Sequence, residues 1–574
     1  MEKIIVRREI PQDYPHLDHL PPLLKRIYSA RNIATANELS KELKQLLPFS
    51  SLLGMDTATV RLVTALEKQQ HILVVGDFDA DGATSTALAV SALEAFGAKQ
   101  VSYLVPNRFE YGYGLTPEIV AVAKQKNPDL LITVDSGISS HAGVRHANAL
   151  GIDVIITDHH LPGKELPPAG AIVNPNQPGD PFPSKCLAGV GVIFYVMLAL
   201  RTHLNDTGWF EKQGLACPNM AQFLDLVALG TVSDVVPLDG NNRILVYQGL
   251  GRIRSGKTRL GIQALLQVSG RQRNTLCAAD LGFAVGPRLN AAGRLDDMTV
   301  GIACLLAKDE CLALTLAQQL DELNKERRVI EQHMQQEANV VVEKLHLDKQ
   351  LPHGLCLYYP EWHQGVVGLV ASRVKEKVYR PVIAFAKVDE ETLKGSARSI
   401  AGLHICDVLG RIATKYPELI SKFGGHAMAA GLSLRLDQYE TFKAIFAAEV
   451  SEHVDEEDLQ PKLISDGELA VEEFTLETAQ LLQEAGPWGQ GFPEPLFDGT
   501  FKLIGQRIVG QRHLKVILQA PGSDHYLDGI VFNVNMDQWP NYRCDHVYIV
   551  YRMDINYYQG RCKLQLLVEE IRQK

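Results

Sequence analysis

Residues 71–82 read His-Ile-Leu-Val-Val-Gly-Asp-Phe-Asp-Ala-Asp-Gly, so that three aspartates follow an apolar run. The run Ile72–Val75 has the unbroken apolar character of a strand that is buried on both faces. Burying Asp77, Asp79 and Asp81 together costs free energy unless their charge is compensated. A divalent cation that prefers oxygen ligands, such as magnesium, manganese or calcium, would compensate it. The stretch therefore predicts a buried strand that ends at a metal site.

Similar apolar runs recur downstream and alternate with helical segments. Strands separated by helices form a parallel sheet with both faces covered, and ligands of such sheets bind at the carboxyl ends of the strands. Side chains that are far apart in the sequence can therefore meet beside the three aspartates. The expected strands are 71–75, 130–134, 154–157 and 171–173, and the expected helices are 84–96, 116–126 and 142–150.

The rest of the chain has a different character in each of three further parts. Residues 309–351 contain no glycine or proline and carry leucines at helical spacing, which predicts one long connecting helix. The next part again alternates strands and helices, which predicts a smaller α/β domain. After an acidic linker, five strand candidates separated by turn residues predict a β-barrel such as an OB-fold. The expected domains are 1–308, 309–351, 352–450 and 459–574.

The composition is that of a globular protein of the cytoplasm. The chain has 574 residues, too many for one core, and 46% of them are hydrophobic and 22% charged. Nine scattered cysteines without a Cys-x-x-Cys pair indicate reduced thiols. No apolar run reaches the ~20 residues that span a bilayer. Charged residues within Met1–Ile10 do not indicate a secretory signal.

Charge is unevenly distributed along the chain. The net charge of −10 points away from nucleic acid. Residues 501–574 nevertheless carry ten basic and seven acidic side chains, with several tyrosines among them. Basic residues interleaved with aromatic rings on a small barrel suit single-stranded DNA, although core tyrosines beneath a solvated face would give the same pattern.

Further acidic and imidazole side chains follow other apolar runs. Asp135 follows the second expected strand, the run Asp158–His160 follows the third, and Asp234 lies in Gly-Thr-Val-Ser-Asp. Taken singly, an aspartate after a strand is usually a turn or cap residue. Together with the first cluster, and all at expected strand ends, these residues provide enough ligands for two metal ions with one bridging carboxylate.

Four motifs in this order resemble those of the DHH phosphoesterases: Asp-x-Asp-x-Asp-Gly, Asp-x-Gly, Asp-His-His and Ser-Asp-x-x-Pro. Gly-Gly-His-x-x-Ala-Ala-Gly at 424–431 resembles the motif of their partner domain, DHHA1. The segments 107–114, 287–294 and 362–368 extend the resemblance to the bacterial single-strand-specific DNA exonucleases of this family, from about residue 50 to the C-terminus. Many DHH enzymes have a histidine in place of Val75, and here Asp77 offers a substitute ligand.

The resemblance also implies roles for individual residues around two Mn²⁺ or Mg²⁺ ions. Asp135 would bridge the ions, and Asp79, with Asp77, would hold one of them. Asp158 would be a second ligand or an orienting acceptor, and His160 would hydrogen-bond the scissile phosphate. The implied metal ligands are Asp77, Asp79, Asp81, Asp135, His159 and Asp234, and the implied catalytic residues are Asp135, Asp158 and His160.

Basic, aromatic and glycine-rich positions are candidates for DNA contacts. Arginines bind phosphate in a bidentate manner and aromatic rings stack on bases, but these arginines can instead pair with core carboxylates. The run Gly424–His426 can place backbone N–H groups against a phosphate, or it can begin a helix. The predicted substrate-binding residues are Arg108, Tyr113, Arg288, Asn290, Arg294, Arg373, Ser396, Arg398, Gly425 and His426.

The resemblance implies a metal-dependent exonuclease that degrades single-stranded DNA from the 5′ end in repair and recombination. It also implies single-strand-binding protein and a RecQ-type helicase as partners, and we expect a monomer. One alternative is a phosphodiesterase for short oligonucleotides or cyclic dinucleotides, against which the basic barrel argues. The other is a non-catalytic DNA-binding subunit, against which the intact set of ligands argues.

Overall fold

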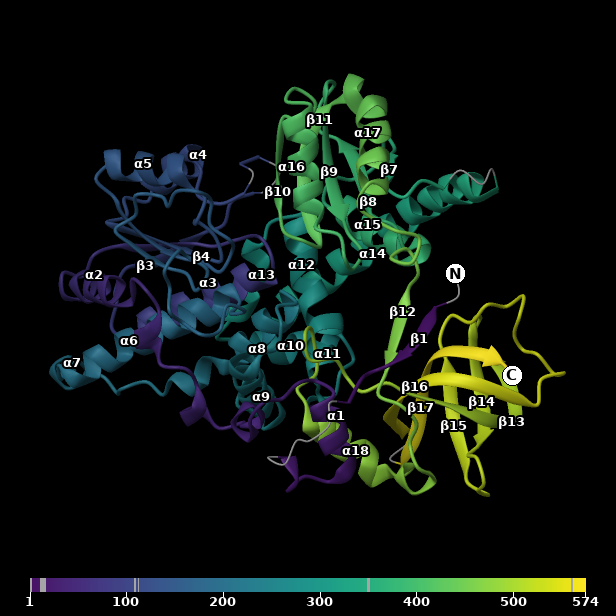
Figure 1. Cartoon of the computed structure of the whole chain (residues 1–574). Coiled ribbons are helices and arrows are strands. Elements are labelled where there is room, and N and C mark those ends of the chain that lie inside the picture. The colour runs from purple at the N-terminus through teal and green to yellow at the C-terminus, as the bar shows by residue number, and fades with distance from the viewer. Residues whose placement is uncertain (1–2, 11–16, 108–109, 112, 348–350, 559–560) are drawn as a thin grey trace. The chain divides into compact units, whose positions relative to one another are not determined.

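The computed structural model describes residues 3–10, 17–107, 110–111, 113–347, 351–558 and 561–574, which form two compact units (Figure 1). The first unit contains Arg7–Asp321 together with Ile464–Lys574, and the second contains Glu322–Leu463 and the N-terminal segment up to Val6. The α/β region and the C-terminal barrel therefore share one unit, although they lie at opposite ends of the sequence. No helix in the described ranges is long and apolar enough to cross a membrane.

The first unit contains a five-stranded parallel sheet with the strand order β3-β2-β4-β5-β6. The parallel α/β fold expected from the sequence is confirmed. One strand, β3, escaped prediction because it lies at the edge of the sheet and its side chains are only half-buried, so it lacks the apolar signature of β2 and β4. The strands are β2 (Ile72–Val75), β3 (Val101–Leu104), β4 (Leu130–Val134), β5 (Asp153–Thr157) and β6 (Ala171–Val173).

Helices cover both faces of this sheet (Figure 1). On one face α4 (Pro117–Lys124) and α5 (His141–Ala149) pack against an apolar layer that includes Val75 and Ile156. On the other face α3 is buried almost all round, because α6 and α8 pack on it. The helices of this region are α2 (Met55–Glu67), α3 (Ala80–Ala95), α6 (Gly189–Asp206), α8 (Leu224–Ser233), α9 (Gly240–Arg254), α10 (Leu260–Val268), α12 (Gly286–Leu295) and α13 (Thr299–Leu306).

The long helix expected from the sequence is α14 (Glu310–Leu347). The residues immediately after it, 348–350, lie outside the described ranges. In the second unit a sheet of order β10-β11-β9-β8-β7 is covered by α15 (Val367–Val378), α16 (Ile405–Lys415) and α17 (Tyr439–Ser451). Its strands are β7 (Leu355–Tyr358), β8 (Val382–Lys387), β9 (Thr392–Arg398), β10 (Lys422–Gly425) and β11 (Ala429–Arg435).

The C-terminal strands close into a barrel of order β13-β14-β15-β17-β16, as expected for an OB-fold. Side chains of β14 alternate between the buried interior and the surface, which is the period of a strand with one buried face. Helix α18 (Leu476–Ala485) precedes the barrel. The strands are β13 (Phe497–Val509), β14 (His513–Gln519), β15 (Tyr526–Val531), β16 (His546–Tyr558) and β17 (Arg561–Gln573).

Arg7 is joined to this barrel through a buried carboxylate. Strand β1 (Ile4–Arg7) pairs with β12 (Lys462–Ser465). Arg7 Nη2 donates to Asp498 Oδ2 over 2.6 Å, and the Tyr548 hydroxyl donates to the same oxygen over 2.7 Å. Burial raises the pKa of Asp498, but hydrogen bonds from Arg7, Ser465 and Tyr548 outweigh it and hold the pKa below its ordinary value.

We expect Arg7→Ala to destabilise the first unit, most strongly at neutral pH. A carboxylate whose pKa is depressed by folding stabilises the fold above its ordinary pKa of ~3.9, and that stabilisation is lost as the pH falls through the folded value. Urea unfolding at pH 7 should therefore show a loss of about 1–3 kcal/mol, and a smaller loss near pH 3. Arg435→Ala, which breaks an exposed pair with Asp437, is the control and should change little. An equal loss at both pH values would contradict the expectation.

Candidate metal centre

The aspartate loop after β2 is shaped by the start of α3. Asp79 is the N-cap of α3, and its Oδ1 accepts the backbone N–H groups of Asp81 and Gly82 over 2.9 and 3.0 Å. Such capping satisfies N–H groups that have no partner inside the helix. Because Asp79 caps these N–H groups, α3 begins at Ala80 and not at Thr84 as the apolar pattern indicated.

Asp81 is fully buried, and its carboxylate contacts the N-terminus of a second helix, α6. Its Oδ2 accepts from Gly189 N over 2.6 Å, and its Oδ1 accepts from Val190 N over 2.9 Å. These N–H groups belong to the first turn of α6, where the helix dipole favours negative charge. Space is tight at this junction, since a Cβ on Gly189 would lie 2.6 Å from Asp135 Oδ1. Residue 189 must therefore be glycine for the two carboxylates to lie side by side.

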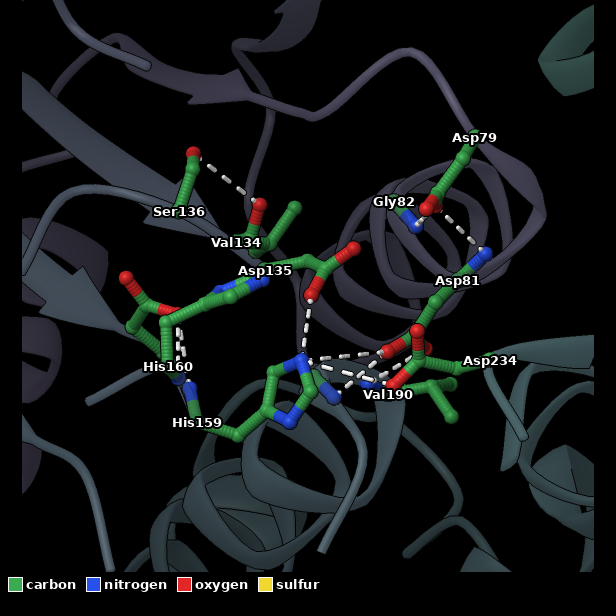
Figure 2. A network of polar contacts seen from close by, with 12 residues as sticks. Asp79, Asp81, Gly82, Val134, Asp135, Ser136, His159, His160, Val190 and Asp234 are labelled. Atoms are coloured by element: carbon green, nitrogen blue, oxygen red, sulfur yellow. Dashed lines mark hydrogen bonds and ion pairs between the residues drawn. The ribbon is translucent and has the colours of Figure 1, made fainter. Parts of the chain in front are cut away.

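Asp135 and His159 come from the ends of neighbouring strands and meet in the same place. Asp135 directly follows β4 and has a φ of 58°, a left-handed conformation that aspartate tolerates better than most residues. Figure 2 shows Nε2 of His159 facing three carboxylates, at 3.1 Å from Asp135 Oδ1, 3.5 Å from Asp234 Oδ2 and 4.0 Å from Asp81 Oδ2. The strands are parallel, so their carboxyl ends lie side by side at one end of the sheet and bring these residues together.

Asp234 reaches the cluster from the end of a helix and not from the end of a strand. The run Leu224–Ser233 forms α8, with Asp234 as its C-cap. The expectation that all of these residues follow strands was therefore wrong for this one. The run is apolar and almost fully buried all round, so its periodicity could not distinguish a helix from a strand.

The potential ligand atoms fall into overlapping groups. Within each group the atoms lie within 4.8 Å of one another. Asp135 and His159 each belong to two of the groups, so Asp135 links the Asp77 group to His159, and His159 links Asp135 to Asp81 and Asp234. The groups are Asp77 with Asp79 and Asp135, then Asp81 with His159 and Asp234, then Asp135 with His159 and His160.

The carboxylates of this cluster repel one another. Burial first, and then the charge of Asp79, raise the pKa of Asp81 to about 7. Burial and the neighbouring aspartates also hold the pKa of Asp135 and of Asp234 well above the ordinary value. The cluster offers buried carboxylate oxygens, which repel one another, and an imidazole nitrogen. These ligands fit a divalent cation such as Mn²⁺ or Mg²⁺, which would relieve that repulsion.

Asp158 orients its neighbours and belongs to none of these groups. Its Oδ1 accepts from His160 Nδ1 over 2.7 Å and from His159 N over 2.7 Å, and its Oδ2 accepts from Ile138 N over 2.9 Å. Although burial opposes ionisation, the hydrogen bond from His160 lowers the pKa of Asp158 to about 2. Burial likewise lowers the pKa of His160, but the bond with Asp158 outweighs it and raises the pKa to about 9. Of the two roles left open for Asp158, the geometry favours the orienting acceptor.

We expect Asp158→Asn to reduce kcat by about 10- to 100-fold, the range typical of residues that orient metal ligands. Asparagine keeps the shape but removes the charge that holds the His160 ring. Asp180→Asn is the matched control, because Asp180 is also buried and also accepts backbone N–H groups, from Leu53 and Phe182. Both variants should lose stability, but only Asp158→Asn should lose turnover of single-stranded DNA. Equal activity in the two variants would contradict the orienting role.

Two asparagines behind the histidines were missed by sequence reasoning. Asn174 Nδ2 donates to His160 O over 2.9 Å, and Asn176 Nδ2 donates to His159 O over 2.6 Å. They fix the backbone of the loop after β5 from the neighbouring strand β6. A signal was present, since Asn-Pro-Asn directly after an expected strand places amide side chains at the ligand-binding edge.

The segment 287–294 proves to be a support for the aspartate loop. Asn290 Oδ1 accepts from Ala80 N over 2.8 Å, and a Cβ on Gly293 would lie only 1.7 Å from Phe78 O. Arg288 is buried and pairs with Asp321 in α14 over 2.7 Å. For Arg288 the structure thus shows the carboxylate partner that was the alternative to a phosphate. Arg294 lies in the last turn of α12.

Tyr113 is the predicted stacking residue nearest to the cluster. Its hydroxyl lies 3.3 Å from His160 Nδ1 and 3.4 Å from Asp135 O, while about half of the side chain is exposed. The ring also makes an edge contact with Phe78 at 6.1 Å. An exposed ring whose hydroxyl is fixed at the site is suited to stack on a base. Arg108, the other prediction from this segment, lies outside the described residues.

The remaining predicted contacts lie in the second unit. Arg398 donates to the neutral acceptors Ser396 Oγ over 2.9 Å and Ala397 O over 2.8 Å, and burial lowers its pKa. Arg373 instead pairs with Glu331 over 3.0 Å and with Glu376 over 3.3 Å. The geometry therefore keeps Arg398 and Ser396 as phosphate candidates and gives Arg373 carboxylate partners.

Gly425 and His426 lie in the hairpin of β10 and β11, so the alternative of a helix start is wrong. His426 N donates to Ala429 O over 2.8 Å. A Cβ on Gly425, which has a φ of 149°, would lie 2.4 Å from Ala429 O. The glycine is thus required by the close approach of the two backbones within the hairpin.

Comparison with known proteins agrees with this architecture. Residues 71–231 match the DHH family, N-terminal domain, residues 339–452 match the DHHA1 domain, and residues 465–570 match the RecJ OB domain. The chain is 57% identical over 564 residues to the single-stranded-DNA-specific exonuclease RecJ of Salmonella typhimurium, covering 98% of this chain and 97% of that protein. It is 56% identical over 566 residues to RecJ of Escherichia coli, covering 98% of each.

A solved relative contains metal. The crystal structure of RecJ in complex with Mn²⁺ from Thermus thermophilus superimposes with a TM-score of 0.82 at 29% sequence identity, covering 100% of this chain and 80% of that one. A parallel sheet that ends in clustered carboxylates and histidines, followed by a DHHA1 domain, defines a DHH phosphoesterase. Within that class the chain belongs to the RecJ family of single-stranded-DNA-specific exonucleases.

Proposed function

We propose that this protein is an exonuclease that hydrolyses single-stranded DNA from the 5′ end with the help of two Mn²⁺ or Mg²⁺ ions. The observation that carries the proposal is the pair of ligand groups that meet at Asp135. Membership of the RecJ family, whose members are named for single-stranded DNA, supports the substrate. The Mn²⁺ and Mg²⁺ complexes of the Thermus thermophilus relative support the cofactors.

The grouping of ligand atoms supports a place for each side chain around the ions. Asp77 and Asp79 would hold one ion, and Asp81, His159 and Asp234 would hold the other. Asp135, which groups with Asp77 and Asp79 and also with His159, would be shared between the ions. When bound, two ions neutralise the phosphate and activate the attacking water in an in-line displacement. The chain therefore needs no nucleophilic side chain of its own.

The other residues position the substrate. Asp158 engages Nδ1 of His160, so the contact with the scissile phosphate would come from Nε2. Tyr113 would stack on a base next to that phosphate. Asn290 and Gly293 hold the loop that carries Asp77 and Asp79. The closed barrel at the C-terminus, with its basic and aromatic residues, would hold a longer stretch of the strand, which a dinucleotide substrate would not require.

The setting follows from the same family. We place the protein in the cytoplasm, in DNA repair and recombination, acting as a monomer alongside single-strand-binding protein and a RecQ-type helicase. Nine free cysteines support a reducing compartment. We also propose the domain boundaries 1–308, 309–351, 352–450 and 459–574. The DHH match at 71–231 and the RecJ OB match at 465–570 lie within these domains, and the DHHA1 match at 339–452 begins inside the proposed helix.

The test uses single strands labelled at either end and incubated with Mn²⁺. The proposal predicts that a 5′ label is released first as a mononucleotide, that chelation by EDTA stops release, and that a long strand is cut much faster than a dinucleotide. Release of 3′ mononucleotides first would refute the polarity. Faster cleavage of the dinucleotide would favour the small-substrate phosphodiesterase.

A further inference from the structure

The residue that follows Asp234 has a strained backbone. Val235 has a φ of 62°, in the left-handed region that β-branched residues rarely adopt. Its side chain is 62% exposed, so its own burial does not compensate for the strain. A conformation of this kind persists only where the surrounding structure fixes it. The end of α8, which carries Asp234, therefore depends on what holds the segment Val235–Leu238.

The C-terminal part of the chain holds this segment. Leu238 N donates to Gln490 O over 2.7 Å. A Cβ on Gly489 would lie 2.7 Å from Leu238 Cδ1, and a Cβ on Gly491 would lie 3.1 Å from Pro237 Cβ. The turn of residues 489–492 thus lies directly against Pro237 and Leu238. Within the α/β region, Asn242 Nδ2 also donates to Pro237 O over 2.9 Å.

The turn is itself closely fixed. Gly489 N donates to Phe492 O over 2.9 Å, and Phe492 N donates to Gly489 O over 3.1 Å. The buried Phe492 ring stacks on Trp488 at 5.0 Å, and the guanidinium of Arg243 lies 4.2 Å from its centre. Arg243 Nη1 also donates to Leu238 O over 2.8 Å. Leu238 is therefore held at its N–H by the turn and at its carbonyl by the arginine that covers Phe492.

We propose that the turn Gly489–Phe492 positions Asp234 for metal binding, with Gly491 and Phe492 as positioning residues. The inference rests on the proposed role of Asp234 as a ligand. Helix ends fray unless they are capped or packed, and Asp234 is the C-cap of α8. Without the turn, Val235 would relax toward an ordinary φ and the end of α8 would lose its fixed direction. The barrel region would then contribute to the metal centre without touching it.

The test compares two glycine substitutions in the full-length protein. Gly491→Ala introduces a Cβ against Pro237 at a φ of 71°. Gly522→Ala introduces one at a φ of 68° with no atom within 4 Å, so it isolates the backbone strain. Titration calorimetry of the metal-free protein with Mn²⁺, without DNA, should show about tenfold weaker binding for Gly491→Ala and unchanged binding for Gly522→Ala. Saturating Mn²⁺ should restore most of its kcat, and its affinity for single-stranded DNA should be unchanged.

Two further variants keep the test decisive. Phe492→Leu keeps an apolar side chain but removes the ring face under Arg243, and should weaken Mn²⁺ binding in the same direction. Adding Val235→Asn to Gly491→Ala should recover Mn²⁺ affinity, because asparagine tolerates the left-handed region. Equal Mn²⁺ affinity in Gly491→Ala and Gly522→Ala would overturn the inference, as would weaker DNA binding with unchanged Mn²⁺ binding. A wild-type protein that neither binds Mn²⁺ nor cleaves DNA would instead refute the proposed function.

Discussion

Asp135→Asn should lower kcat on single-stranded DNA by a factor on the order of 10³ or more. Loss of a residue that only orients metal ligands lowers activity by about 10- to 100-fold. The loss should be larger for Asp135, because it is the carboxylate shared by two ligand groups. Asparagine fits the left-handed backbone at φ 58°, so the change removes the charge without straining the turn. Single-turnover release of mononucleotides at saturating Mn²⁺ measures the effect.

The same substitution should stabilise the metal-free protein. Burial and neighbouring aspartates raise the pKa of Asp135, so the unfolded chain releases this proton at lower pH than the folded chain. Stability of the metal-free wild type therefore falls as the pH rises above the ordinary value of ~3.9. Asparagine cannot ionise, and the Tm of metal-free Asp135→Asn should exceed that of the wild type at pH 7.

The control residue lies at the amino ends of the same parallel strands, away from the ligand cluster. Asp153 begins β5, is exposed, and pairs with Arg61 over 2.7 Å. Asp153→Asn should leave kcat and Tm nearly unchanged. Retained activity in Asp135→Asn would contradict the shared-ligand role, and a lower Tm in its metal-free form would contradict the charge repulsion.

Gly293→Ala should reduce activity by at least about 100-fold although residue 293 offers no ligand. The new Cβ would lie 1.7 Å from Phe78 O, a backbone oxygen that moves only with the loop of Asp77 and Asp79. A displacement of about 1 Å at reacting groups costs on the order of 10²-fold. Overpacking should also lower the free energy of unfolding by about 1–3 kcal/mol.

Gly251→Ala is the matched control for that substitution. Gly251 lies inside α9, and a Cβ there would meet no atom within 4 Å. Alanine is favoured over glycine in a helix interior by up to about 1 kcal/mol, so this variant should be as active as the wild type and slightly more stable. Kinetics and urea unfolding of both variants provide the comparison, and wild-type activity in Gly293→Ala would disprove the support role.

The strands β2 and β4 and the aspartates beside them could be predicted because the signal is local. A strand buried on both faces is a short unbroken apolar run, and Asp77, Asp79, Asp81 and Asp135 directly follow such runs. The same holds for the five barrel strands, whose turns are marked by glycine, proline, asparagine and aspartate. Edge strand β3 and the hairpin strands β10 and β11 were missed, because half-exposed or glycine-rich strands lack that pattern.

The types of metal ligand could also be predicted from the sequence, but the ion-pair partners of the arginines could not. Arg288 and Arg373 looked like phosphate contacts, and the structure gives them Asp321 and Glu331. These ion pairs join residues that are 33 and 42 positions apart, so no local sequence pattern predicts them.

By itself, the sequence determined the fold class, the metal-binding chemistry and the family, since each rests on motifs that are contiguous in the chain. Only the tertiary structure decided that Asp234 arrives from a helix end, that Asn290 and Gly293 support the aspartate loop, and that the turn at 489–492 lies against the segment after Asp234. The physical reason is that these are close approaches between backbones and amide groups. Such contacts depend on distance in space, and residue types alone do not encode that distance.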